Sequence, residues 1–130
     1  MAYREFVSLI HKSTPRDYLA RVTQRDKAEV AELAIKYDYD YWDGSRETGY
    51  GGYRYDGRWR KVADAMASAY GLEPGMRVLD VGSGKGFLLH DLRESVPGIE
   101  VAGIDISAYG VAHTMDDVKP FCRVGTAAEL

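Results

Sequence analysis

The chain has 130 residues, a formal net charge of −3 and one cysteine, Cys122, and these values exclude several classes of protein. The length fits one domain with a small core. A mildly acidic chain without basic runs gives no electrostatic reason to expect nucleic-acid binding. A lone cysteine rules out an internal disulfide and suits a reducing compartment. The apolar patch at 6–10 is too short for a secretory signal or a membrane span, so we expect a cytoplasmic protein without membrane contact.

The first 58 residues are expected to form a helical cap followed by a loop rich in tyrosine and glycine. Thr14-Pro15 is typical of a helix start, and apolar residues then recur at helical spacing, which predicts helices near 15–24 and 26–37. Five glycines interrupt the segment from Tyr37 to Trp59, so no continuous helix is expected there. Because aromatic residues are dense in this segment, we expect an ordered loop rather than a disordered linker.

Residues 59–130 are expected to form a separate α/β unit. Asp56 is expected to cap a helix that runs to about Tyr70, where Gly71 ends it. The buried stripe expected for this helix comprises Trp59, Val62, Ala63, Met66 and Tyr70. Beyond it, the pattern predicts alternating strands and helices over 77–81, 87–96, 100–104, 107–117 and 121–124. Such alternation with short links predicts a parallel three-stranded sheet.

The most informative segment runs from Val78 to Phe87 and reads VLDVGSGKGF. A buried strand leads into three alternating glycines and then a helix, so a ligand can approach the backbone closely and meet the free N–H groups of the helix start. A phosphate-binding P-loop requires Ser or Thr after Gly-Lys, but Gly86 follows Lys85. The dinucleotide fingerprint requires a third glycine where Phe87 stands. This spacing disfavours a nicotinamide-dependent oxidoreductase.

The pattern D-x-G-x-G-x-G over 80–86 resembles motif I of class I S-adenosylmethionine-dependent methyltransferases. The resemblance implies a truncated Rossmann-like methyltransferase fold of class α/β, with three parallel strands in the order 3-2-1. It implies S-adenosylmethionine as the cofactor, with the glycine-rich turn on its methionine end, Asp105 on its ribose and Thr126 near its adenine. The cofactor-binding residues that it implies are Asp80, Gly82, Ser83, Gly84, Gly86, Phe87, Asp105, Ile106, Thr126 and Ala127.

The resemblance also bears on activity, because the family has seven strands and this sequence supplies the first three. We therefore expect a chain truncated after the third strand. The residues that usually contact the acceptor come later in the family, so no catalytic residue is identified. The scattered histidines show no metal-ligand spacing, and no metal is expected. The resemblance implies a methyltransferase acting on a small-molecule or saccharide acceptor; the alternative is a non-catalytic cofactor-binding or oligomerising remnant.

Two further expectations concern surfaces. The outer edge of the first strand, Arg77–Val81, would be unpaired, and a bare apolar edge tends to find another chain, which predicts a homodimer. The aromatic loop has two interpretations that both stay open: a lid over the methyl donor that also lines the acceptor pocket, or an aromatic core that packs the cap onto the sheet. Aromatic faces attract cations, and tyrosine hydroxyls orient polar groups. The candidate substrate-contacting residues are Tyr41, Trp42, Tyr50 and Tyr53.

Overall fold

The computed structural model describes residues 4–9, 37–44, 50 and 52–130. Apart from Tyr37, the helices expected near 15–24 and 26–37 lie outside the described residues. The described elements are η1 (Val7–Leu9), α3 (Tyr39–Trp42), α4 (Arg60–Tyr70), β1 (Arg77–Val81), α5 (Phe87–Ser95), β2 (Glu100–Asp105), α6 (Ala108–Ala112), η2 (Lys119–Phe121), β3 (Cys122–Val124) and η3 (Ala127–Glu129). Within the described ranges, no helix is long and apolar enough to cross a bilayer.

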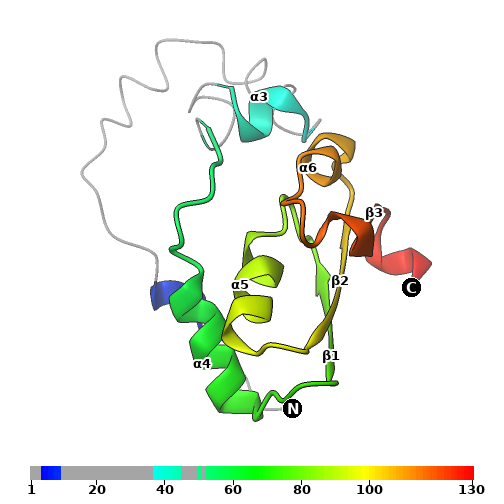
Figure 1. The fold of residues 1–130 in the computed structure, drawn as a ribbon. Coiled ribbons are helices and arrows are strands. Elements are labelled where there is room, and N and C mark those ends of the chain that lie inside the picture. The colour runs from blue at the N-terminus through cyan, green and yellow to red at the C-terminus, as the bar shows by residue number, and fades with distance from the viewer. Residues whose placement is uncertain (1–3, 10–36, 45–49, 51) are drawn as a thin grey trace.

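The three strands form one parallel sheet in the order β1-β2-β3, which confirms the expected fold class and strand order. Arg77 pairs with Glu100 and Val81 with Ile104, so β1 and β2 end side by side. Figure 1 shows α5 against the sheet with α4 beyond it, and α3 close to α6 above the ends of the strands. Because ligands of open parallel sheets bind outside the carboxyl ends of the strands, this arrangement puts α3 and α6 beside the candidate site.

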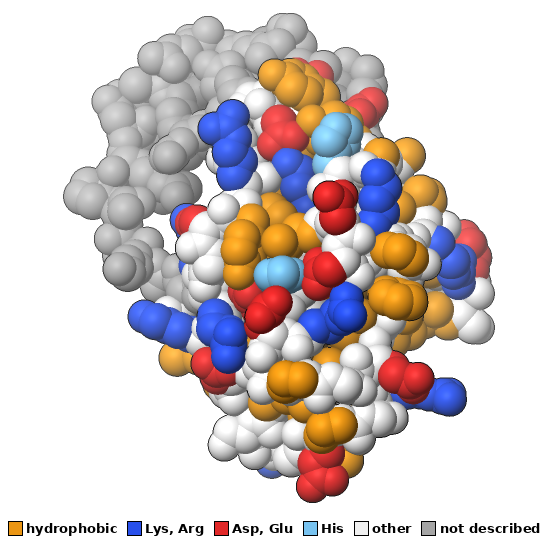
Figure 2. All heavy atoms as spheres, viewed as in Figure 1, with side chains coloured by type: hydrophobic (Ala, Val, Ile, Leu, Met, Phe, Trp, Pro, Cys, Tyr) orange, Lys and Arg blue, Asp and Glu red, His pale blue; other side chains and the backbone are white. Residues whose placement is uncertain are grey.

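The core lies on one face of the sheet, where α5 is packed between the strands and α4. Its buried members are Ala63, Leu89, Leu92, Val96, Ile99, Val101 and Val118. The stripe expected on α4 is correct at Val62 and Ala63, which are fully buried. It is wrong at Tyr70, which is 54% exposed and packs its ring near Phe6 instead, with centroids 5.8 Å apart. Figure 2 shows acidic and basic side chains interspersed on the face of α4 and α5.

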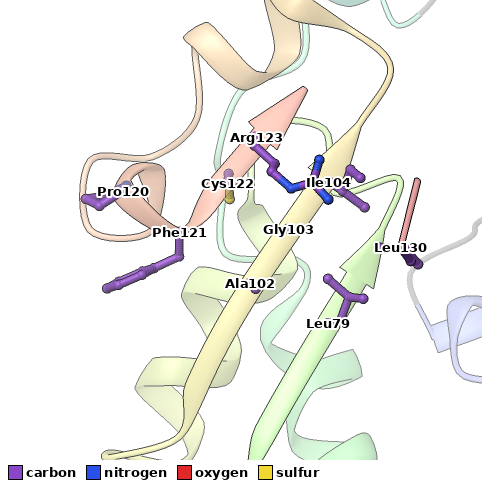
Figure 3. A pocket seen from close by; sticks show the side chains of 9 residues that line it. All are labelled: Leu79, Ala102, Gly103, Ile104, Pro120, Phe121, Cys122, Arg123 and Leu130. Carbon is purple, nitrogen blue, oxygen red and sulfur yellow. The ribbon is translucent and has the colours of Figure 1, made fainter. Parts of the chain in front are cut away.

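The opposite face of the sheet carries apolar side chains in a shallow hollow. Leu79 of β1 and Phe121 beside β3 are each about half exposed there, at 49% and 51%. Figure 3 shows the side chains that line it: Leu79, Ala102, Gly103, Ile104, Pro120, Phe121, Cys122, Arg123 and Leu130. Its lining reaches Ile104, which pairs with Val81 at the end of β1, but includes none of the residues implied by the resemblance. It is therefore distinct from the site predicted from the sequence.

Two expectations about the tyrosine-rich segment and the start of α4 are wrong in detail. The segment contains the short helix α3, because the Asp38 carboxylate accepts a hydrogen bond from the Tyr39 N–H at 2.9 Å and caps it. Asp56 does not cap α4. Its carboxylate accepts from the Arg58 N–H at 3.1 Å and pairs with the Arg58 guanidinium at 2.7 Å, so the helix begins later, at Arg60.

The helix expected over 107–117 is shorter than predicted. Ser107 caps α6 by accepting from the Gly110 N–H, but the helix ends at Ala112. The Met115 N–H donates to the Lys85 carbonyl at 3.0 Å. Because that N–H would otherwise have to bond within a continuing helix, the contact with the glycine-rich turn ends α6 early. The boundary between domains expected after residue 58 stays a prediction.

Candidate functional site

The turn between β1 and α5 contains three glycines that face three different surroundings. A Cβ on Gly82 would have no atom within 4 Å, so this glycine faces open space. A Cβ on Gly84 would lie 2.7 Å from Trp42 Cη2. A Cβ on Gly86 would lie 2.8 Å from Val118 Cγ2. Only Gly82 therefore leaves room for a ligand at its Cα, whereas Gly84 and Gly86 make room for the protein's own side chains.

The N–H groups of this turn are largely used inside the protein. Gly82 and Ser83 both donate to the Ile104 carbonyl, at 2.7 and 3.2 Å, and Gly86 donates to the Ser83 carbonyl at 2.9 Å. Gly84 donates to Asp105 Oδ2 at 2.8 Å. The N–H groups of these four turn residues are therefore not free for a ligand, while the expected free N–H groups of the helix start at Phe87 stay a prediction. At Gly82, the turn lets a ligand approach its backbone closely.

Asp105 ends β2 and is held in place by two backbone donors. Its Oδ2 accepts from Gly84 and its Oδ1 accepts from the Ser107 N–H, each at 2.8 Å. The residue is only 8% exposed. A carboxylate has about four acceptor positions, so each oxygen can still accept a hydrogen bond from a ligand hydroxyl. The side chain is thus fixed in direction and retains the capacity to bind a diol.

Asp80 lies one strand away, near the end of β1. Burial, followed by the negative charge of Asp105, raises the pKa of its carboxyl to about 6. Two carboxyl groups at the ends of adjacent strands would both be stabilised as anions by a nearby positive charge. These two carboxyl groups therefore favour a ligand that carries hydroxyl groups and a cation.

The other residues implied by the resemblance lie in two kinds of place. Ser83 and Phe87 are buried: the Ser83 hydroxyl lies close to Gly103, and the Phe87 ring stacks on Tyr53 with centroids 4.7 Å apart. Ile106, next to Asp105, is 54% exposed. Thr126 and Ala127, which follow β3, are also exposed. Just before them, the Gly125 N–H donates to the Asp105 carbonyl at 2.9 Å. The exposed members are the ones accessible from solvent.

The four aromatic residues proposed to contact the substrate form one cluster. Trp42 stacks on Tyr50 with centroids 5.5 Å apart, Tyr50 lies 4.4 Å from Tyr53, and Tyr41 meets Trp42 edge-on at 4.9 Å. Burial, followed by the influence of Tyr50, raises the pKa of both Tyr41 and Tyr53 to about 12. Their hydroxyls stay protonated at neutral pH, so they can donate hydrogen bonds but are not populated as bases. The packing joins the aromatic segment to the turn, as the core interpretation requires.

A buried ion pair ties the same segment to the turn. Lys85, 7% exposed, places its Nζ 2.7 and 2.8 Å from the two oxygens of Asp43 and 2.7 Å from the Tyr53 carbonyl. The Tyr109 hydroxyl donates to Asp43 at 2.6 Å. Burial alone would raise the pKa of Asp43, but hydrogen bonds from Lys85, Tyr109 and the Tyr53 N–H outweigh it and lower the pKa to about 2. Sequence reasoning missed this pair; its only signal was a lysine among glycines.

The structure thus contains a parallel β-α-β unit with a glycine-rich turn after its first strand and a buried carboxylate at the end of its second. Residues 72–114 match the model of a family described as methyltransferase domain, which confirms the resemblance to the S-adenosylmethionine-dependent methyltransferases and identifies this segment as methyltransferase-domain sequence. The matched segment contains Asp80, the turn and Asp105. The aromatic cluster and Thr126 lie outside it. A search of curated proteins gave no match.

Proposed function

We propose that the chain binds S-adenosylmethionine and forms the cofactor-binding part of a methyltransferase for a small-molecule or saccharide acceptor. The observation that carries this proposal is the Asp105 carboxylate, which two backbone donors hold at the end of β2 inside the segment that matches the methyltransferase family. The residues fit the cofactor: Asp105 retains acceptor positions for the ribose hydroxyls, and Gly82 leaves open space for the ligand. The expected truncation and the cytoplasmic location stay predictions.

The chemistry proposed for these residues is binding and orientation. When bound, the cofactor supplies a methyl group on a positively charged sulfur, which is activated for transfer by that charge. Asp105 accepts hydrogen bonds from the ribose, Asp80 adds negative charge near the cationic end, and the backbone of Gly82 packs against the ligand. The remaining contribution is alignment of the donor with the acceptor and exclusion of water. No described side chain is assigned as the base.

We assign binding of the methyl acceptor to the aromatic cluster. Tyr50 is 49% exposed, and the neutral hydroxyls of Tyr41 and Tyr53 can donate hydrogen bonds to a polar molecule. Trp42 brings the cluster next to Gly84 of the turn. These features support a polar acceptor of modest size beside the methyl donor.

Calorimetric titration with S-adenosylmethionine and S-adenosylhomocysteine tests the proposal. We expect micromolar binding by the unchanged chain and at least about tenfold weaker binding by Asp105→Asn, because a hydrogen bond to a charged group is worth roughly 1.5–3 kcal/mol. Asp91→Asn is the matched control, since Asp91 on α5 is also buried but accepts its hydrogen bond from the Tyr55 hydroxyl, at 2.5 Å. Circular dichroism confirms that each variant is folded. Absence of binding at millimolar ligand would refute the proposal.

A further inference from the structure

Trp42 occupies a different position from the other aromatic residues of its cluster. It is 6% exposed, and its ring lies between the glycine-rich turn and α6. A Cβ on Gly84 would lie 2.7 Å from Trp42 Cη2, and a Cβ on Gly110 would lie 3.2 Å from Trp42 Cζ2. Any larger residue at either glycine would have to displace the ring. The indole is thus enclosed by the two loops that follow β1 and β2.

The indole N–H completes a connected set of buried hydrogen bonds. Trp42 Nε1 donates to Ser107 Oγ at 2.9 Å, and the same hydroxyl donates to the Tyr37 carbonyl. The Ser107 N–H donates to Asp105 Oδ1, while the Gly84 N–H donates to Asp105 Oδ2. Trp42 therefore contacts both residues whose N–H groups hold the Asp105 carboxylate: Gly84 through its ring and Ser107 through its N–H.

We propose that Trp42 is a positioning residue for Asp105, and through it for the ribose of the cofactor, rather than a residue that contacts the acceptor. The inference rests on the proposed function. A ring wedged between Gly84 and Ser107 fixes the separation of the two N–H donors, and that separation fixes the direction of the carboxylate. Hydrogen bonds to a ligand diol depend steeply on such direction. Trp42 therefore contributes to ribose recognition without touching the ribose.

The neighbouring contacts explain how the ring keeps its place. Asp43, the next residue, is bound to Lys85 of the turn, and the Gly52 N–H donates to the Trp42 carbonyl at 3.1 Å. Tyr50 stacks on the indole at an interplanar angle of 13°. α3 is therefore attached to the turn through Asp43, and a segment from before the matched methyltransferase sequence packs against Gly84.

The test compares S-adenosylhomocysteine with its 2′-deoxyribose analogue by calorimetric titration. We expect the unchanged chain to prefer the ribose form by at least about tenfold, the value of a hydrogen bond to a carboxylate. Trp42→Phe should lower this preference to about twofold or less, mainly by weakening binding of the ribose form. Trp59→Phe, the same substitution at the tryptophan that precedes α4, should leave the preference unchanged.

Ser107→Ala provides a second variant that keeps the ring and removes the acceptor of its N–H. We expect the same loss of preference, with folding followed by circular dichroism. If either folded variant weakens both ligands by an equal factor, or keeps the preference, Trp42 does not act through Asp105 and the inference is wrong. If the unchanged chain binds both ligands equally, the inference fails while cofactor binding stands. If it binds neither, the proposed function fails and the inference fails with it.

Discussion

Gly82, Gly84 and Gly86 have different tasks in one turn, although all have positive φ angles. Gly86→Ala should destabilise the fold more than Gly82→Ala. A Cβ at residue 86 would lie 2.8 and 2.9 Å from Val118 and Thr114, and the backbone there is also strained at φ +76°. Gly82→Ala meets open space and costs only the left-handed strain, about 1–2 kcal/mol. Urea unfolding should show a loss for Gly86→Ala at least twice that for Gly82→Ala. Equal losses would mean that packing at Gly86 is unimportant.

Also at the residue scale, the raised pKa of Asp80 should make the stability of the fold depend on pH. Its folded pKa is about 6, whereas an unfolded Asp titrates near about 3.9. Between these values the folded chain keeps a proton that the unfolded chain has lost, so stability falls as pH rises from 4 to 6, by up to about 3 kcal/mol. Asp80→Asn should flatten this part of the profile in urea unfolding. Asp116→Asn, an exposed control, should not; a profile that Asp80→Asn leaves unchanged would contradict the prediction.

At the scale of elements, the attachment of α3 to the glycine-rich turn depends on the Lys85–Asp43 pair. Lys85→Met would leave the Asp43 carboxylate, which is 20% exposed, without its cation and should cost roughly 1.5–3 kcal/mol at pH 7. Asp43 has a folded pKa of about 2, below its unfolded value, so its stabilisation is complete above about pH 4 and is lost as pH falls toward 2. Lys85→Met should remove much of this acid sensitivity. Urea unfolding at pH 7 and pH 3 measures both effects.

Arg60→Met is the matched control for that variant. Arg60 pairs with Asp64 at 3.0 Å on the surface of α4, where solvent weakens the attraction, so its loss should change stability little. A Lys85→Met variant as stable as Arg60→Met would show that the buried pair does not anchor α3.

The elements also show which parts of the fold the sequence could predict. The strands and α5 were predictable because their apolar periodicity and glycine-rich boundaries are local signals. The end of α6 was not, since it depends on a bond from Met115 to Lys85, which lies on the turn after β1. Likewise Asp80 and Asp105 could be recognised from their places after strands. The position of Trp42 depends on Ser107 and Gly110, more than 60 residues away, so no local pattern reveals it.

At the scale of the whole molecule, β1 and β3 form the two edges of the sheet and pair with no further strand within the described part of the chain. β1 lies at the edge of the sheet, and its Leu79 and Val81 are 49% and 50% exposed. We propose that two copies pair antiparallel along β1 about a two-fold axis at Leu79, which satisfies the backbone groups of both edges. In that register Leu79 faces its symmetry mate and Arg77 lies opposite Val81.

Sedimentation velocity over a range of concentrations tests this pairing. The unchanged chain should sediment with the mass of two copies, whereas Leu79→Lys should sediment as one, because the axis would bring two ammonium groups together. Val124→Lys is the matched control, since Val124 is also 50% exposed but belongs to β3 at the other edge of the sheet. The Val124→Lys variant should remain a dimer. A monomeric unchanged chain at high concentration would exclude pairing through β1, and dissociation by both substitutions alike would place the interface on the apolar sheet face instead.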